Sequence, residues 1–255
     1  MTLDYVDLAT ARAATGTRII TTSLVASPWS EAAKGMFTLA RLPALVVARG
    51  RDSTDAIAWT GIDNVPVVIH DHEPARTNWA SIVGLANRLA GANVLVPVDP
   101  VARADLFGLL DLVAGEDGLG WNARLAMLRA SIDSGGSSGF PAPVATYLAG
   151  RYGHRGDITV AVLRERVRVQ LELLARHLTG SYFGGDHPTA LDVYTATFLT
   201  PYSSIDEAAC PQMIAPLRRA FGAAHEALGD LVPTELSAHR KRMFDQHLPW
   251  PIRLS

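Results

Sequence analysis

The chain has a single cysteine, no basic run and no long apolar run, and each absence excludes a class of protein. The single cysteine, Cys210, excludes an internal disulfide framework and any CxxC redox or zinc motif. The formal net charge is -2 and no basic run is present, so nucleic acid is not expected as a partner. No apolar run approaches the roughly 20 residues that a membrane helix needs. The N-terminus also lacks the pattern of a signal peptide, so we expect a cytoplasmic protein without a membrane partner.

What is present fits a globular protein with a full core. The 255 residues are 48% hydrophobic, enough for one large domain or two modest ones. Lysine occurs only at Lys34 and Lys241, whereas arginine and alanine are abundant. This balance is typical of a GC-rich bacterial gene.

Strand-like and helix-like patterns alternate up to about residue 91. Residues 18–23 (RIITTS) and 44–48 (ALVVA) are strand candidates, and apolar residues recur at helical spacing over 28–41 and 79–89. The polar stretch between the second and third strands has no clear pattern. Pro66 must lie at the start or edge of the third strand, and a cis Val65–Pro66 bond is one possibility. This order predicts a small α/β domain.

The pattern becomes helical after residue 91. Residues 92–100 form a linker, and a domain boundary is expected near residues 91–98. Helices are predicted over 102–114, 122–132, 158–178, 189–200 and 215–228. Residues 133–143 (DSGGSSGFPAP) have the composition of a loop. Thr189 and Asp192 have the spacing of a capping box, for which we expect a structural role.

Ser27 allows two interpretations. It precedes Pro28, and Ser-Pro is a common start of a helix, so its side chain could be a simple N-cap. Alternatively, a hydroxyl at a helix N-terminus, where free N–H groups and the positive dipole end favour anions, could stabilise the thiolate of a ligand. The local sequence does not choose between them.

Other signals are weaker. The segment HDHE at residues 70–73 falls where a turn is expected, which favours a solvated turn over a metal site, and no metal is expected. The segment GGSSG at 135–139 matches G-x-S-x-G, but a helix precedes it, whereas a nucleophile elbow follows a strand. The segment GGDH at 184–187 is too short for a phosphate loop. Cys210 has no evident histidine partner, so a structural thiol is expected.

Three segments together resemble the glutathione S-transferases. Residues 27–43 (SPWSEAAKGMFTLARLP) resemble the active-site loop and first helix of serine-type members, especially the plant tau class. Residues 64–89 (NVPVVIHDHEPARTNWASIVGLANRL) resemble the family's cis-proline segment and the following helix, and residues 181–199 (SYFGGDHPTALDVYTATFL) resemble its buried capping-box helix. The resemblance spans roughly residues 18–210. It implies an α+β/α architecture, a thioredoxin-like N-terminal domain (18–91) followed by an all-helical C-terminal domain (99–248).

The resemblance also assigns site residues. Ser27 matches the serine that contacts the glutathione sulfur, and Ser30 is a nearby second candidate. Val65 and Pro66 match the pair whose backbone binds the cysteinyl part of glutathione. Thr77 and Asn78 stand where the family usually has a Glu-Ser pair that holds the γ-glutamyl end. Without that carboxylate, the charge-assisted contact to the ligand's ammonium, typically about 1.5–3 kcal/mol, is lost.

Three functions therefore remain open. The first is a glutathione-dependent transferase or isomerase acting on a small electrophile, in which Ser27 activates the thiol. The second is a non-catalytic binding or scaffold protein of the same fold, which the absence of the Glu-Ser pair favours. The third is a transferase that uses another low-molecular-weight thiol. The resemblance implies a homodimer, and the electrophile pocket is expected between the domains near Trp121, Arg124, Met127 and Tyr147. Arg76 is either a carboxylate partner or simply solvated.

Overall fold

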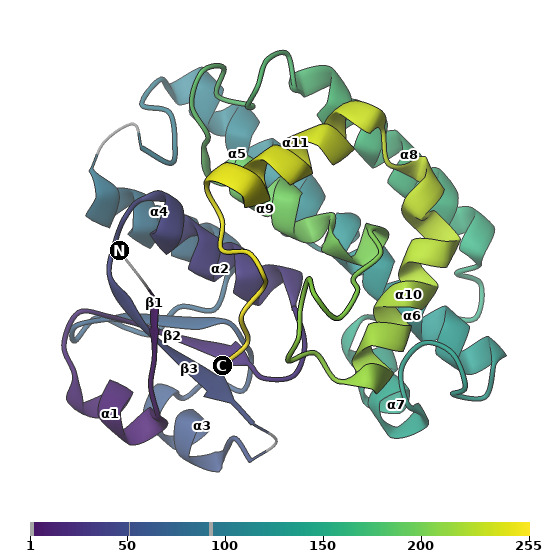
Figure 1. Cartoon of the computed structure of the whole chain (residues 1–255), viewed down its shortest axis with the longest axis horizontal. Helices are drawn as coiled ribbons and strands as arrows, with labels where there is room; N and C mark the ends of the chain where they lie inside the picture. Colours follow the sequence, from purple (N-terminus) through teal and green to yellow (C-terminus); the bar gives the residue numbers. More distant parts are fainter. Residues whose placement is uncertain (1–2, 51, 92–93) are drawn as a thin grey trace.

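A four-stranded mixed sheet forms the N-terminal part of the protein, whose computed structural model describes residues 3–50, 52–91 and 94–255 (Figure 1). Its strands stand in the order β1-β3-β2-β4, with β4 antiparallel to β2 and the other neighbours parallel. The parallel strands need crossover helices, and α1 and α2 supply them. The bounds are β1 Leu3–Tyr5, β2 Thr17–Thr22, β3 Ala44–Arg49 and β4 Val67–His70.

Two helices cover each face of the sheet. Because side chains alternate along a strand, Ile19 of β2 packs in the cluster that contains α2 and α4, whereas its neighbour Ile20 packs on the other face. There it meets Ala11 of α1 and Ala56 of α3. Figure 1 shows α2 and α4 on one side of the sheet and α1 and α3 on the other. The bounds are α1 Leu8–Ala13, α2 Pro28–Leu39, α3 Thr54–Thr60 and α4 Trp79–Ala90.

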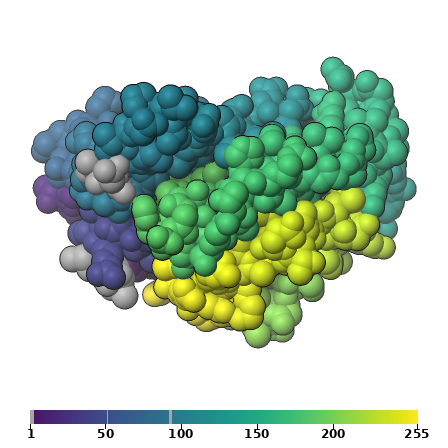
Figure 2. All heavy atoms as spheres, turned by 90° about the horizontal axis from the view of Figure 1, so that it is seen from above, coloured from purple at the N-terminus to yellow at the C-terminus, as the bar shows by residue number. Residues whose placement is uncertain are grey.

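The rest of the described chain is helical. Its centre is α9, in which every residue is buried and around which α2, α5 and α11 pack. Figure 2 shows the last helix and the tail, in yellow, on the surface of the face in view. The bounds are α5 Pro100–Ala114, α6 Leu119–Asp133, α7 Ala142–Arg151, α8 Val160–His177, α9 Ala190–Phe198, α10 Ala215–Leu228 and α11 Thr234–Gln246, with short 3₁₀ helices at Thr200–Tyr202 and Gly229–Leu231.

The capping box at the start of α9 is confirmed. The Asp192 carboxylate accepts hydrogen bonds from the Thr189 N–H at 2.7 Å and from the Phe183 N–H at 2.9 Å. It also lies 2.9 Å from the Nε2 atom of His239, on α11, and both of these side chains are fully buried. Asp192 therefore ties the start of α9 to the loop before it and to the last helix.

Several expectations on secondary structure need correction. The five helices predicted after residue 100 correspond to α5, α6, α8, α9 and α10. The stretch between the second and third strands is not irregular, because it contains α3, although Arg51 lies outside the described residues. The helices α7 and α11 and the β1–α1 unit were not predicted. The first residues of the predicted linker, 92–93, also lie outside the described residues, and the boundaries 18–91 and 99–248 stay predictions.

Close packing between the two parts depends on Gly120 at the start of α6. A Cβ atom there would lie 2.5 Å from a ring carbon of Phe198 and 2.8 Å from a ring carbon of Trp29. We expect Gly120→Ala to lower the free energy of unfolding by about 1–3 kcal/mol through overpacking. Gly108→Ala in α5 is the matched control, because a Cβ there meets nothing within 4 Å. It should raise stability by roughly 0.5–1 kcal/mol in the same denaturant titration, and equal effects would contradict the packing argument.

Candidate functional site

The strand register brings three predicted segments to one end of the sheet. Ile20 of β2 pairs with Val67 of β4, so the loop that follows β2 and leads to Ser27 leaves the sheet beside the start of β4. On the other side of β4, Arg76 forms an isolated bridge with Val68. The segments around residues 27, 65–66 and 77–78 therefore meet at the same end of the sheet, next to the N-terminus of α2.

Ser27 is the N-cap residue of α2, but its side chain does not cap the helix. Its backbone is extended, with φ -66° and ψ 122°, and Pro28 occupies the first helical position. The carbonyl of Ser27 accepts the first helical hydrogen bond, from the Glu31 N–H at 2.9 Å. The hydroxyl makes no capping hydrogen bond, and the residue is only 9% exposed. The simple side-chain cap is therefore wrong, and the Ser27 hydroxyl is free to contact a ligand.

Two further hydroxyls near Ser27 in this arrangement are buried without a partner. Ser30, in the first turn of α2, is fully buried and its Oγ makes no hydrogen bond. The Oγ1 atom of Thr77, just before α4, is in the same state. A buried hydroxyl without a hydrogen bond costs free energy, and such groups are uncommon in folded proteins. Both are among the residues that the sequence analysis assigned to ligand binding.

The Val65–Pro66 peptide bond is cis, as the proline in the third strand suggested. Pro66 is buried, and β4 begins at the next residue. Neither the N–H nor the C=O of Val65 takes part in a backbone hydrogen bond. The turn thus presents an N–H donor and a carbonyl acceptor that an extended peptide-like ligand can use.

Asn78 and Arg76 have local partners. Asn78 is the N-cap of α4, and its Oδ1 accepts a hydrogen bond from the Ala80 N–H at 2.9 Å, which leaves its amide N–H groups free. Arg76 donates to Glu73 at 2.6 Å, and Arg88 donates to the same carboxylate. These hydrogen bonds from Arg88 and Arg76 lower the pKa of Glu73. Arg76 is therefore already paired and is not the free carboxylate partner that the sequence left open.

The N-terminal part with the sheet and the helical part contact each other on both sides of this region. The Trp29 Nε1–H donates to the carbonyl of Ala114 at 3.0 Å, and its ring meets Phe198 edge-on at 4.9 Å. Near the cis-proline turn, Arg151 of α7 donates to the Asn64 side chain at 2.6 Å. No local pattern pointed to the pair of Asn64 and Arg151, because the two are distant in the chain and α7 itself was not predicted.

The four residues expected around the electrophile differ in their exposure. Trp121 lines a cavity of about 450 Å³ together with Tyr152, whose ring also lies 6.4 Å from that of Trp29. Arg124 and Met127 are buried, and Tyr147 is 60% exposed.

The segments that carry the weaker sequence signals lie in turns or in the core. Residues 71–73 form a turn after β4, and GGSSG and GGDH also lie in turns. Within the described ranges, no group of three or more His, Cys, Asp or Glu side chains is placed to hold a metal ion. Cys210 is fully buried, and burial together with the nearby Glu31 charge raises the pKa of its thiol. Among the helices that the structure describes, none is both long and apolar enough to cross a membrane.

The structure is similar to solved glutathione transferases. A glutathione S-transferase from Methylobacterium radiotolerans, in complex with glutathione sulfonate, is 18% identical with a TM-score of 0.59, over 94% of this chain and 98% of that one. Rice GST1, in complex with glutathione, is 15% identical with a TM-score of 0.55, over 93% of both chains. Leishmania TDR1, a trimeric glutathione transferase, is 16% identical with a TM-score of 0.49, over 90% of this chain. This chain spans about half of TDR1, 48% of its length.

The likenesses to the Methylobacterium and rice structures establish the fold. A thioredoxin-like domain followed by an all-helical domain, the architecture of the glutathione transferases, is confirmed for this chain. No protein-family model and no curated protein matches the sequence.

Proposed function

We propose that this protein binds a low-molecular-weight thiol, with glutathione as the first candidate, and activates it for attack on a small electrophile. The observation that carries the proposal is the set of free polar groups at the N-terminus of α2. The Ser27 hydroxyl makes no hydrogen bond, the Ser30 and Thr77 hydroxyls are buried without partners, and the Val65 backbone is unpaired. Buried polar groups without a hydrogen-bond partner are uncommon in folded proteins, and a bound ligand is one way to satisfy them.

The proposed chemistry is stabilisation of a thiolate at Ser27. The Ser27 O–H donates a hydrogen bond to the sulfur, and the free N–H groups at the start of α2 add the positive end of the helix dipole. Both effects favour the anionic thiolate, the nucleophilic form, at neutral pH. The thiolate then forms a carbon–sulfur bond with the electrophile, which releases a leaving group or accepts a proton after addition. Serine at this position, where other members have cysteine, argues against disulfide exchange.

The free groups of the site match the sulfur and the cysteinyl part of glutathione better than they match its γ-glutamyl end. The N–H and C=O of Val65, beside cis-Pro66, match the backbone of a cysteinyl residue. Thr77 and Asn78 offer only neutral groups to the ligand's ammonium, and the nearby Glu73 is held by two arginines. We therefore propose that glutathione binds here more weakly than at a site with a carboxylate in place of Thr77.

The electrophile, the assembly and the compartment are part of the same proposal. The electrophile is a small molecule that enters between the domains, near the Trp29 and Tyr152 rings. Two of the solved structures above, from Methylobacterium radiotolerans and rice, contain glutathione sulfonate or glutathione, which supports this thiol as the co-substrate. We propose a homodimer in a bacterial cytoplasm, in keeping with the composition and with the fold.

A fluorescence titration with glutathione tests thiol binding. Trp29 lies two residues after Ser27, and Trp79 directly follows Asn78, so the fluorescence of both should report saturation at up to millimolar glutathione. Conjugation of chlorodinitrobenzene, followed in the same samples, tests catalysis. Binding with turnover supports the transferase. No binding of glutathione or of any other small thiol would refute the proposal.

Thr77 allows a more specific prediction. Thr77→Glu restores the carboxylate that the resemblance leads one to expect, and it should tighten glutathione binding by about tenfold, the equivalent of one charge-assisted hydrogen bond. Thr77→Val keeps the shape and removes the unpartnered hydroxyl. It should weaken glutathione binding without lowering the melting temperature. A loss of stability with unchanged binding would make Thr77 purely structural.

A non-catalytic binding protein is the second candidate. Thr77 favours it, because this threonine stands where the family usually has the glutamate that pairs with the ligand's ammonium. It predicts saturable binding of glutathione, or of another thiol, with no conjugation of any electrophile offered. The titration and the rate assay, made on one preparation, separate the two candidates.

A further inference from the structure

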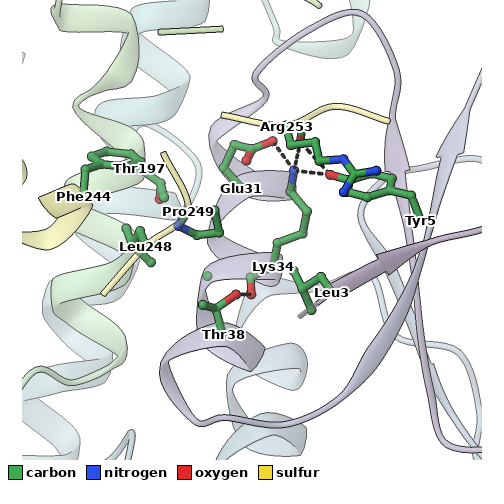
Figure 3. Close-up of a pocket in the computed structure, with 11 residues that line it drawn as sticks. Leu3, Tyr5, Glu31, Lys34, Thr38, Thr197, Phe244, Leu248, Pro249 and Arg253 are labelled. Carbon is green, nitrogen blue, oxygen red and sulfur yellow. Dashed lines mark hydrogen bonds and ion pairs between the residues drawn. The ribbon is translucent and has the colours of Figure 1, made fainter. Parts of the chain in front are cut away.

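A cavity of about 210 Å³ lies where the two ends of the chain meet α2 (Figure 3). One wall is β1, another is the tail that follows α11, and α2, α9 and α11 complete the lining. In Figure 1 the tail runs from α11 past α2 to the sheet. None of the residues proposed for thiol binding lines this cavity, so the two sites are separate.

Most of the lining is apolar. Leu3 of β1, Phe244 of α11, and Leu248 and Pro249 of the tail surround the space in Figure 3. Ligand sites for drug-sized molecules are usually about 300–1,000 Å³, so this smaller cavity suits a ligand of about one ring. Burial of that ring against these side chains supplies the hydrophobic part of the binding free energy.

One polar cluster stands at the cavity wall. The Lys34 ammonium lies 2.9 Å from Glu31 Oε1, 3.0 Å from the Tyr5 hydroxyl and 2.7 Å from the Arg253 carbonyl, so its three N–H groups are all used. Burial lowers the pKa of Lys34, but the attraction of Glu31 and Tyr5 outweighs it, and the net shift keeps the lysine charged. Burial also raises the pKa of Glu31, which the charge and hydrogen bond of Lys34 oppose. We take the pair as ionised because the ammonium lies 2.9 Å from the carboxylate. The side chains of Lys34 and Glu31 are only 6% and 11% exposed.

Glu31 is less well satisfied than Lys34. Among the described residues its only polar partner is Lys34, through one carboxylate oxygen. In Figure 3 no dashed line reaches the other oxygen. An ionised carboxylate can accept about four hydrogen bonds. Glu31 lines the cavity, and we take its second oxygen as the acceptor for a donor placed there.

We propose that this cavity binds a small neutral phenol, whose hydroxyl donates to the free oxygen of Glu31 while its ring lies against Leu3, Phe244 and Leu248. A carboxylate ligand has no proton to donate to the free oxygen of Glu31 and would be repelled by its charge. An ammonium ligand would be repelled by Lys34 and by the Arg253 guanidinium, which lies over the Tyr5 ring at 4.6 Å. A neutral donor avoids both repulsions. This inference does not depend on the proposed thiol chemistry.

The alternative is that the ion pair only anchors the tail. Tyr5 and Lys34 both donate to the carbonyl of Arg253, at 2.5 and 2.7 Å, which fixes the tail against β1 and α2. Anchoring explains the bonds of Lys34, but it gives no role to the free oxygen of Glu31 or to the apolar space beside it. A ligand test therefore distinguishes the two accounts.

Fluorine NMR with para-fluorophenol tests the proposal on the unaltered protein. The expected result is saturable binding of para-fluorophenol. Its methyl ether, para-fluoroanisole, has the same ring but no O–H, and should bind about tenfold or more weakly because the hydrogen bond to a charged acceptor is lost. Millimolar glutathione should leave both signals unchanged, since it occupies the other site.

Two variants locate the binding. Leu3→Phe places a ring into the cavity and should weaken para-fluorophenol binding by at least about tenfold. Val101→Phe, at a position on α5 that is 70% exposed, is the matched control and should change nothing. Circular dichroism confirms that both variants fold. Absence of binding, equal binding of the ether, indifference to Leu3→Phe, or displacement by glutathione would each overturn the proposal.

Discussion

Replacement of Asp192 by alanine is expected to lower the free energy of unfolding by about 3–5 kcal/mol, enough to unfold most of the chain at moderate temperature. The carboxylate is fully buried and accepts from the N–H groups of Thr189 and Phe183, from the Thr189 hydroxyl and from His239. Alanine leaves these donors buried without partners, which costs more than the bonds themselves contribute. A urea titration measures the loss.

Asp133→Ala is the matched control for Asp192. Asp133 ends α6 in an exposed pair with Arg129, and such pairs contribute about 0–1 kcal/mol. Asp192→Asn should fall between the two, because the amide keeps one acceptor oxygen. A loss below about 1 kcal/mol for Asp192→Ala would show that α9 does not depend on its capping box.

Ser27→Ala is expected to lower kcat/KM for thiol conjugation by about 10²-fold. This is the effect typical of losing one hydrogen-bond donor to a negatively charged reacting atom, here the thiolate sulfur. The hydroxyl makes no hydrogen bond within the protein, so its removal should leave the melting temperature unchanged. The Kd for glutathione should change much less than kcat, since Val65 and the helix N-terminus still hold the ligand. Steady-state kinetics with chlorodinitrobenzene, beside a binding titration, gives both values.

Two other serine variants complete that experiment. Ser53→Ala removes another N-cap serine without a side-chain cap, at the start of α3, and should leave kcat/KM unchanged. Ser27→Thr keeps a hydroxyl and should recover part of the rate. Equal rates for Ser27→Ala and the unaltered protein would move the activating role to Ser30 or to the backbone.

Features that depend on neighbouring residues were predictable from the sequence. The capping box of Thr189 and Asp192 and the helix over Ala215–Leu228 follow from local spacing, and both are confirmed. The proline in the third strand pointed to the cis bond at Pro66. In each case the preference is set within a few residues, so an isolated stretch of sequence contains the information.

Features that depend on distant partners were not predictable. The strand β1 is only three residues long and exists because it pairs with β3, some forty residues later. The tail has no local pattern and is fixed by Tyr5 and Lys34. The absence of a capping hydrogen bond from the Ser27 side chain was also beyond local sequence, because Ser-Pro starts a helix with or without a side-chain cap. The roles of the six predicted site residues stay predictions.

The most direct test of the central claim is the pH titration of glutathione bound to this protein, followed by the ultraviolet absorbance of its thiolate. If Ser27 stabilises the thiolate, the pKa of the bound thiol lies below that of free glutathione. Ser27→Ala should then raise this pKa by about 1–2 units, the equivalent of one hydrogen bond to a charged sulfur. A bound thiol whose pKa equals that of free glutathione, and is indifferent to Ser27→Ala, would contradict this claim.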